Sequence, residues 1–177
     1  KRKNICTYLC ASIMSQQLST KVADVIYKRF IGLYNGKEPT PQQILETPFE
    51  KLRGIGLSNA KVGYVQNVAL FEIEFGMDAK KLNKMSNEEV IDYLLVIKGV
   101  GRWTIEMLLM FALGREDVFA VDDLGIQNAM ISLNKLDTTD KKQLREDMLH
   151  LSKKWSPYRT YACVHLWRWK DNALIVK

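Results

Sequence analysis

The chain has 177 residues, of which 47% are hydrophobic, enough for a folded domain with a sizeable core. No apolar run approaches the ~20 residues of a membrane-spanning helix, and no basic-then-apolar leader precedes a cleavage site. The net charge of +6 favours a polyanionic partner, although many proteins with this charge bind none. Composition therefore indicates one globular domain, with room for two lobes.

Helical periodicity and capping residues predict two helices at the start. Residues 4–14 and 21–33 each show one apolar face, and Ser19 or Thr20 can cap the second helix. The polar run Ser15-Gln16-Gln17 separates them. The first face carries Ile5, Leu9 and Ile13, and the second carries Val22, Val25, Ile26 and Phe30.

Capping signals predict the helices of the middle. Thr40-Pro41 and Thr47-Pro48 each place a capping hydroxyl before a proline, and Thr47 forms a capping box with Glu50. A turn at Gly54-Ile55-Gly56 precedes a helix from Ser58 to about Phe75. A further capping box, Ser86 with Glu89, begins a helix that runs to about Ile97.

The second half continues with helices over about 103–113, 124–133, 140–153 and 158–169. Gly114 can end the first of these in a left-handed cap, and Thr138 or Thr139 can cap the third. No segment shows sustained strand alternation. We therefore expect an all-α fold of roughly ten helices.

Two short motifs stand out in this half. The turn Lys98-Gly99-Val100-Gly101-Arg102 has two glycines where the backbone has to come close to another group, and it leads into a helix whose first amides lack acceptors. A phosphate oxygen fits there, with Lys98 and Arg102 adding charge, although an ordinary turn between helices explains the glycines as well. The second motif is an adjacent pair of aspartates, Asp122-Asp123, after the apolar run 118–121.

These motifs together resemble the helix-hairpin-helix-Gly/Pro-Asp superfamily of DNA glycosylases, and within it the 3-methyladenine DNA glycosylase II branch. The resemblance rests on residues 99–104 followed by Asp123, and extends to residues 13–19 and 158–167, so it spans almost the whole chain. One departure is that the loop before the aspartates carries Ala120-Val121 where many relatives have proline.

The resemblance implies a fold and an activity. It implies two lobes, a central one over about 35–120 and another from 1–34 plus 121–177, with the active-site cleft between them. It also implies a monomeric enzyme that flips alkylated bases out of duplex DNA and hydrolyses the N-glycosidic bond. Two alternatives remain, a helix-hairpin-helix module that only binds DNA and a bifunctional glycosylase that also cleaves the strand.

Asp123 matches the catalytic position of this family. A fixed carboxylate stabilises the positive charge that develops on the sugar, and it orients or activates the attacking water. From the residues alone, either aspartate could simply cap the following helix. The resemblance assigns catalysis to Asp123 and leaves Asp122 as a cap or support.

Trp103 determines the subtype. Bifunctional members carry a lysine directly after the hairpin, and its amine attacks the sugar; an indole cannot do so. In the alkylation branch this tryptophan lines the base pocket, and the resemblance adds Met107 and Trp167 to the same pocket. Core packing is the alternative for Trp103. Tyr158, Tyr161 and Trp169 are interpreted as packing residues.

The remaining assignments concern DNA and cofactors. The family fills the hole left by a flipped nucleotide from the loop that here contains Gln16 and Gln17, and Gln17 is our choice for the wedge; a polar turn is the alternative. The family also binds a monovalent cation, Na⁺ or K⁺, on carbonyls near Lys98 and Val100. No other cofactor is expected, because only Cys163 lies where some relatives have four cysteines for an iron–sulfur cluster.

The histidines and cysteines are too few and too scattered to predict a zinc site or a disulfide framework. A reducing, intracellular setting is the expectation that follows, in the cytoplasm or nucleoid of a prokaryote or in the nucleus of a eukaryote. The histidines and cysteines of the chain are Cys6, Cys10, Cys163, His150 and His165.

Overall fold

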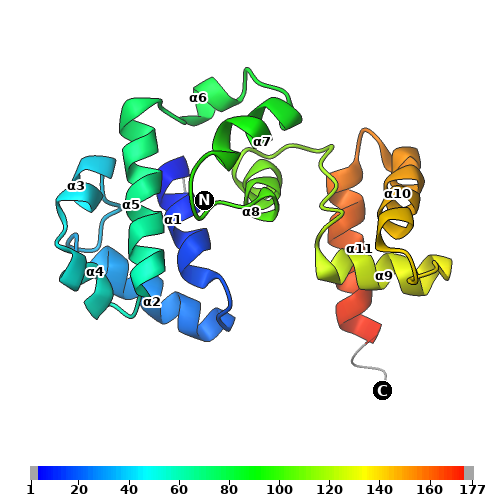
Figure 1. Ribbon diagram of the computed structural model, residues 1–177, viewed down its shortest axis with the longest axis horizontal. Coiled ribbons are helices and arrows are strands. Elements are labelled where there is room, and N and C mark those ends of the chain that lie inside the picture. Colours follow the sequence, from blue (N-terminus) through cyan, green and yellow to red (C-terminus); the bar gives the residue numbers. More distant parts are fainter. Residues whose placement is uncertain (1–3, 174–177) are drawn as a thin grey trace. The chain divides into compact units, whose positions relative to one another are not determined.

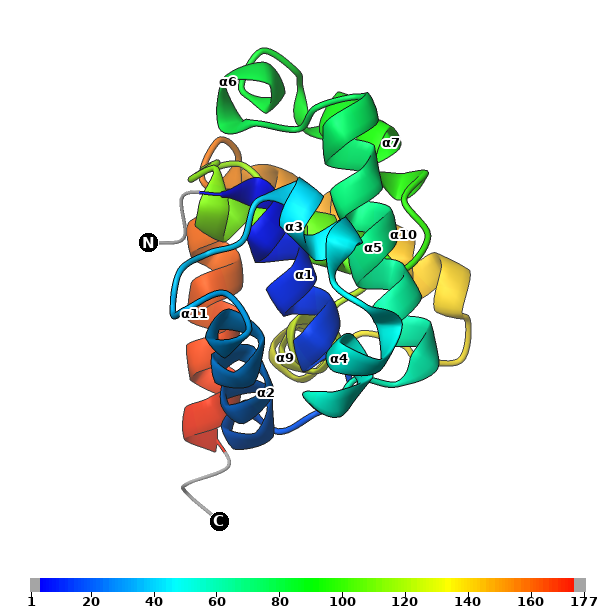
Figure 2. The same ribbon diagram turned by 90° about the vertical axis from the view of Figure 1, so that its left-hand side faces the viewer.

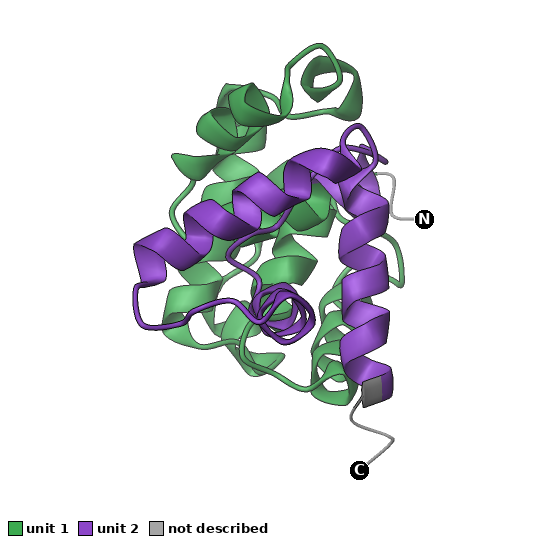
Figure 3. Cartoon of the chain, turned by 90° about the vertical axis from the view of Figure 1, so that its right-hand side faces the viewer, with its two compact units in different colours: residues 1–108 green, residues 109–177 purple. Residues whose placement is uncertain are grey.

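The computed structural model describes residues 4–173, which form helices and connecting turns without any strand. The all-α class predicted from the sequence is confirmed. None of the described helices combines the length and the hydropathy needed to cross a membrane. The chain divides into two compact units, residues 1–108 and 109–177 (Figure 3). The lobe boundaries expected from the resemblance stay a prediction.

The first unit contains eight α-helices among its described residues: α1 (Ile5–Ser15), α2 (Thr20–Gly32), α3 (Pro41–Glu46), α4 (Phe49–Gly54), α5 (Asn59–Glu74), α6 (Ala79–Leu82), α7 (Asn87–Leu95) and α8 (Arg102–Met107). A π-helical turn, Leu108–Ala112, continues α8. The described part of the second unit contains α9 (Leu124–Asn134), α10 (Lys141–Ser152), a 3-10 turn (Lys153–Trp155) and α11 (Arg159–Ala173).

Helices α1 and α5 lie side by side at the centre of the first unit (Figures 1 and 2). The predicted apolar face of α1 is confirmed, because Ile5, Leu9 and Ile13 are all buried. For α2 the prediction is half right. Ile26 and Phe30 are buried, whereas Val22 and Val25 are 45% and 43% exposed, so the buried stripe is narrower than the sequence pattern predicted.

Several predicted caps are confirmed, and two are wrong. Ser86 and Glu89 form their capping box at the start of α7. Thr47 instead lies at the end of α3, where its hydroxyl donates to the Gln43 carbonyl at 2.7 Å, and α4 has no side-chain cap. Asp140, rather than Thr138 or Thr139, caps α10, because its carboxylate accepts from two main-chain amides of the first turn.

In the second unit α9 packs against α11, and the 3-10 turn joins α10 to α11. The core between these helices includes Ile126, Met130, Met148 and Cys163. The apolar run 118–121 is buried and leads directly to α9. The predicted left-handed end at Gly114 is confirmed by its φ of 71°.

Candidate active site

The carboxylate of Asp123 is held by two N–H donors. Asp123 is the N-cap of α9, and its Oδ1 accepts a hydrogen bond from the Ile126 backbone amide at 2.9 Å. The same oxygen accepts from the Trp167 indole Nε1 at 2.8 Å. The two donors come from different helices, and they fix the position of Oδ1. The helix cap that the sequence offered as an alternative is therefore present, and a second, long-range donor is added to it.

The approach of Trp167 depends on the first turn of α9. A Cβ atom at Gly125 would lie 3.0 Å from Asp123 Oδ1 and 3.1 Å from Trp167 Cδ1, so only glycine leaves the indole this room. The Trp167 ring also packs against Phe111, with 6.1 Å between the ring centroids. Sequence reasoning placed Trp167 in a base pocket but did not foresee its bond to Asp123.

Asp122 is not a cap. Its side chain points to Arg145, whose Nε lies 3.1 Å from Asp122 Oδ1. Both side chains are about half exposed, at 46% and 44%, so this pair is of the kind that contributes little to stability. The two adjacent aspartates thus have different environments: one anchored between α9 and α11, the other in a surface ion pair.

The start of α11 is tied to the segment before Asp123. Arg159 donates from Nε to Asp117 Oδ1 at 2.6 Å and from Nη2 to Asp117 Oδ2 at 2.8 Å. These hydrogen bonds hold the pKa of the Asp117 carboxyl below its usual value. The Ser156 hydroxyl also donates to Asp117, at 2.9 Å. Because α11 carries Trp167, this bridge helps to fix the helix that reaches Asp123.

The glycine hairpin lies between α7 and α8. Its turn is closed by the Val100 amide, which donates to the Ile97 carbonyl at 3.0 Å. Gly99 has a φ of 102°, and a Cβ atom there would overlap the ring of Tyr64. Gly101, the N-cap of α8, has open space where its Cβ would be. Gly99 therefore makes room for an aromatic ring of the protein itself, whereas Gly101 leaves the turn open to another molecule.

The two basic residues of the hairpin differ. Lys98 is exposed. Arg102 donates to both oxygens of Glu88, at 2.9 and 3.1 Å, and to Glu106 at 3.2 Å. Glu106 is buried, so Arg102 compensates a carboxylate that has left water. The two carboxylates thus offset the positive charge of Arg102, which the sequence analysis had assigned to a phosphate contact. Arg102 instead links α7 to α8.

Gln16 and Gln17 lie in the turn between α1 and α2. The Gln16 side chain is half-buried, and its Nε2 donates to the Gly99 carbonyl at 3.4 Å. Gln17 is exposed and has a φ of 59°, in the left-handed region. The turn that carries Gln16 and Gln17 and the glycine hairpin are thus in direct contact within the first unit, through residues 83 positions apart in the chain.

The other predicted pocket residues are divided between the units. Trp103 is 45% exposed, which rules out simple core packing. Met107 is buried, and its carbonyl accepts from the Tyr8 hydroxyl at 3.1 Å. Both belong to the first unit, and Trp167 belongs to the second. That these three residues form one base pocket stays a prediction.

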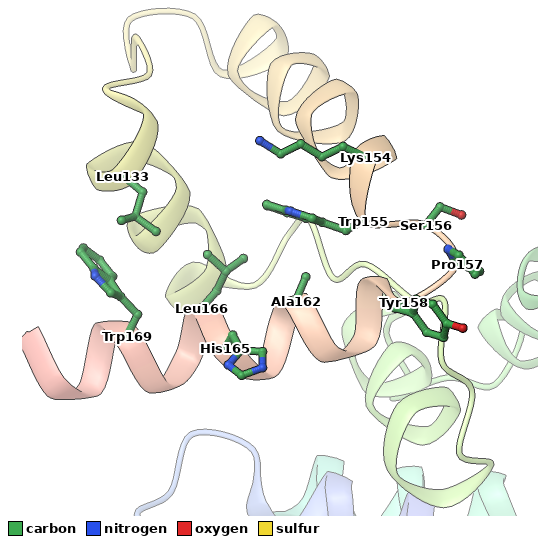
Figure 4. Close-up of a pocket in the computed structure, with 10 residues that line it drawn as sticks. All are labelled: Leu133, Lys154, Trp155, Ser156, Pro157, Tyr158, Ala162, His165, Leu166 and Trp169. Carbon is green, nitrogen blue, oxygen red and sulfur yellow. The ribbon is translucent and has the colours of Figure 1, made fainter.

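The second unit also contains an apolar cavity of about 640 Å³ (Figure 4). Leu133, Trp155, Leu166 and Trp169 point into the space between α9, the 3-10 turn and α11. Neither Asp123 nor Trp167 lines it. Packing is only partial for the three aromatic residues predicted to pack, Tyr158, Tyr161 and Trp169, which are 58%, 50% and 37% exposed. The first and third line this cavity, and the rings of the first two lie 6.1 Å apart.

Within residues 4–173, no three His, Cys, Asp or Glu side chains come close enough together to hold a metal ion. The three cysteines are buried thiols.

Known proteins resemble this chain over most of its length. The model of the HhH-GPD superfamily, base excision DNA repair proteins, matches residues 10–157. DNA-3-methyladenine glycosylase 1 of Schizosaccharomyces pombe is 39% identical over 162 residues, which cover 90% of this chain and 70% of that protein.

Two solved structures are similar. The S. pombe 3-methyladenine DNA glycosylase in complex with abasic DNA has a TM-score of 0.79 and 37% identity, covering 92% of this chain and 79% of that one. The Bacillus halodurans DNA-3-methyladenine glycosidase has a TM-score of 0.85 and 37% identity, covering 96% and 77%.

Proposed function

The chain belongs to the HhH-GPD superfamily of base excision DNA repair proteins, and from this premise we propose that it is a monofunctional DNA glycosylase for alkylated bases. The relatives named above are 3-methyladenine glycosylases, and one of them has been solved with abasic DNA, the product of base removal. The proposed substrate is duplex DNA that contains 3-methyladenine-type lesions. The proposed enzyme works as a monomer in the compartment that holds the DNA.

The Asp123 carboxylate carries the proposal. Hydrolysis breaks the bond between C1′ and the base nitrogen, and the base leaves with the electron pair. The oxygen of a water molecule bonds to C1′, and that water releases one proton to the solvent. Positive charge develops on the sugar during this step, and an ionised carboxylate in a fixed position stabilises it. Hydrogen bonds from Trp167 and Ile126 fix Asp123 Oδ1 in advance, so the carboxylate does not have to reorganise when the charge appears.

Trp103 supports the monofunctional assignment. A bifunctional glycosylase needs an amine that forms a Schiff base with the sugar, and the indole at this position has no such nucleophile. Its large exposed face suits stacking and cation–π attraction with an electron-poor, positively charged alkylated base. Strand cleavage is therefore not part of the proposed reaction.

The hairpin is the proposed DNA grip. The open space at Gly101 and the exposed Lys98 suit a phosphate contact that carries no sequence information. Arg102 contributes less than the sequence predicted, because Glu88 and Glu106 already bind it. Gln17 is the proposed wedge, since it is exposed at the tip of its turn while Gln16 holds that turn to Gly99.

A Na⁺ or K⁺ ion on the hairpin carbonyls is part of the proposal. The Lys98 carbonyl accepts a hydrogen bond from Asn67 Nδ2 at 3.3 Å, and a carbonyl oxygen has two lone pairs. The hairpin therefore fits a cation, which the carbonyls of Lys98 and Val100 would hold. Such an ion would add positive charge beside the phosphate.

The decisive experiment measures which free bases the purified protein releases from methylated duplex DNA. Release of alkylated purines, with abasic sites that stay unnicked until alkali is added, is the expected result. Borohydride should trap no covalent protein–DNA adduct; a trapped adduct would establish the bifunctional alternative. Binding to the duplex without any base release would favour the non-catalytic module instead.

A further inference from the structure

Lys61 of α5 places its ammonium group on the end of α1. Its Nζ donates to the Met14 carbonyl at 3.0 Å and to the Gln16 carbonyl at 2.7 Å. The last carbonyls of a helix have no hydrogen-bond donor within it and carry partial negative charge. An ammonium group there donates hydrogen bonds to these carbonyls and also compensates their charge. None of the ion pairs among the described residues involves Lys61. Partial burial lowers the pKa of Lys61.

The same side of α5 supports the glycine hairpin. Tyr64 and Asn67 follow Lys61 at three-residue intervals, so the three side chains lie along neighbouring turns. The Tyr64 ring occupies the space that a Cβ atom of Gly99 would need. Asn67 Nδ2 donates to the Lys98 carbonyl at 3.3 Å. Helix α5 thus contacts the wedge loop at one point and the hairpin at two others.

The wedge loop is itself in an unfavourable conformation. Gln17 has a φ of 59°, which costs a residue with a Cβ free energy unless its surroundings hold it there. Lys61 binds the carbonyl of the preceding residue, Gln16, and the Gln16 side chain binds Gly99. Gln16, the residue before Gln17, is therefore held through both its main chain and its side chain, while Gln17 stays exposed.

We propose that Lys61 is a positioning residue for nucleotide flipping, which acts by holding the Gln17 loop at a set distance from the hairpin. The wedge has to enter the base stack while the hairpin holds the phosphate backbone, so the two loops need a common support. Helix α5 provides this support, and the Lys61 ammonium is its link to the wedge. This inference rests on the proposed function, because it takes Gln17 as the wedge of a glycosylase.

A direct phosphate contact by Lys61 is the competing explanation, and it predicts different measurements. Each lost phosphate contact flattens the salt dependence of DNA binding by about one unit of log-log slope. A positioning residue whose donors are bound to carbonyls leaves that slope unchanged and slows the steps that follow binding.

The test compares Lys61→Met, which removes the ammonium, with Lys61→Arg, which keeps a cation able to donate to both carbonyls. Lys80→Met is the matched control, because Lys80 is an exposed lysine of the same unit. Flipping is followed by the fluorescence of 2-aminopurine placed opposite a tetrahydrofuran abasic site, which needs no chemistry. Base release from methylated DNA is measured in single turnovers at saturating enzyme, together with the salt slope for undamaged duplex.

We expect Lys61→Met to reduce the fluorescence change and to slow base release about tenfold, with an unchanged salt slope. Lys61→Arg should recover most of both signals, and Lys80→Met should behave as the wild type. In a Gln17→Ala background, Lys61→Met should have little further effect, because Lys61 acts through the Gln17 side chain and that side chain is already absent. Effects that multiply in the double variant, or a flattened salt slope with normal flipping, would overturn the proposal.

Folding is controlled by the melting temperature of each variant. If Lys61→Met does not fold, Lys61→Gln carries the same test, since its side chain is uncharged and one bond shorter, and so loses the ammonium that spans both carbonyls. Failure of the proposed function would appear in the wild type as a lack of base release. Failure of the positioning role would appear only in the Lys61 variants of an active enzyme.

Discussion

The indole N–H of Trp167 and the carboxylate of Asp123 form a hydrogen bond of 2.8 Å between residues 44 positions apart. Because the Ile126 amide donates to the same oxygen, the carboxylate is held between the first turn of α9 and the side of α11. A hydrogen bond to a charged group contributes more than one between neutral groups, so this contact is a strong restraint on the position of the Asp123 carboxylate.

Replacement of Trp167 by phenylalanine keeps an aromatic ring and removes the N–H donor. Loss of a hydrogen bond to a charged group costs about 1.5–3 kcal/mol, so base release should slow by roughly tenfold to a hundredfold. Binding to damaged duplex should change by less than about threefold, because the ring remains. Single-turnover base release and a binding isotherm would check this; an unchanged rate would show that Trp167 does not orient Asp123.

Asp123→Asn should abolish base release and leave binding to damaged DNA within about tenfold, because the amide keeps the shape and loses the charge that stabilises the sugar cation. The adjacent variant Asp122→Asn is the matched control. It removes only the surface pair with Arg145 and should retain nearly full activity. The opposite result, an active Asp123→Asn and an inactive Asp122→Asn, would shift the catalytic assignment by one residue.

The two hairpin glycines should respond differently to alanine. Gly101→Ala adds a methyl group in open space at the proposed phosphate site, so it should weaken binding to damaged and undamaged duplex alike and flatten the salt slope by about one unit. Its melting temperature should stay close to that of the wild type. Gly99→Ala should lower the melting temperature, because its methyl group would overlap the Tyr64 ring.

Normal DNA binding by a folded Gly101→Ala variant, with an unchanged salt slope, would make the hairpin only a joint between helices. The DNA grip would then lie elsewhere, and the second glycine turn at Gly54-Ile55-Gly56 would be the next place to test.

The ion pair of Asp117 with Arg159 should make the free energy of unfolding depend on pH. The folded-state pKa of Asp117 lies below its unfolded value because Arg159 donates to the carboxylate, so its contribution is present above the unfolded pKa of about 3.9. That contribution is lost as the pH falls through the folded pKa. At pH 7, Asp117→Asn should therefore lower the free energy of unfolding by about 1 kcal/mol. In a chain of this size that loss lowers the melting temperature by roughly 2–4 °C.

The difference between the wild type and Asp117→Asn should shrink below about pH 4, as the wild-type carboxyl takes up a proton. Thermal melts followed by circular dichroism at several pH values measure it. The surface pair of Asp122 with Arg145 serves as the comparison, and Asp122→Asn should change the melting temperature little at any pH. A constant offset between wild type and Asp117→Asn down to pH 3 would exclude the ionic contribution.

Local signals in the sequence determined most of the secondary structure. The capping box of Ser86 with Glu89, the cap of Thr40 on α3 and the buried face of α1 were all predicted correctly. These features depend on groups a few residues apart, so the sequence alone contains them. Local reasoning went wrong where two helices compete for one residue: Thr47 ends α3 instead of beginning α4.

The resemblance to the glycosylase superfamily singled out Asp123, whereas the residue types by themselves did not distinguish a helix cap from a catalytic carboxylate. Tertiary structure supplied the Trp167 donor, the pairing of Arg102 with Glu88, the Tyr64 ring behind Gly99 and the Lys61 ammonium on the end of α1. Each of these joins groups far apart in the chain, and nothing in the spacing of residues specifies which helix faces will meet. The sequence by itself determined which groups are available for chemistry; packing of the helices decided which of those groups are bound by others and which face solvent.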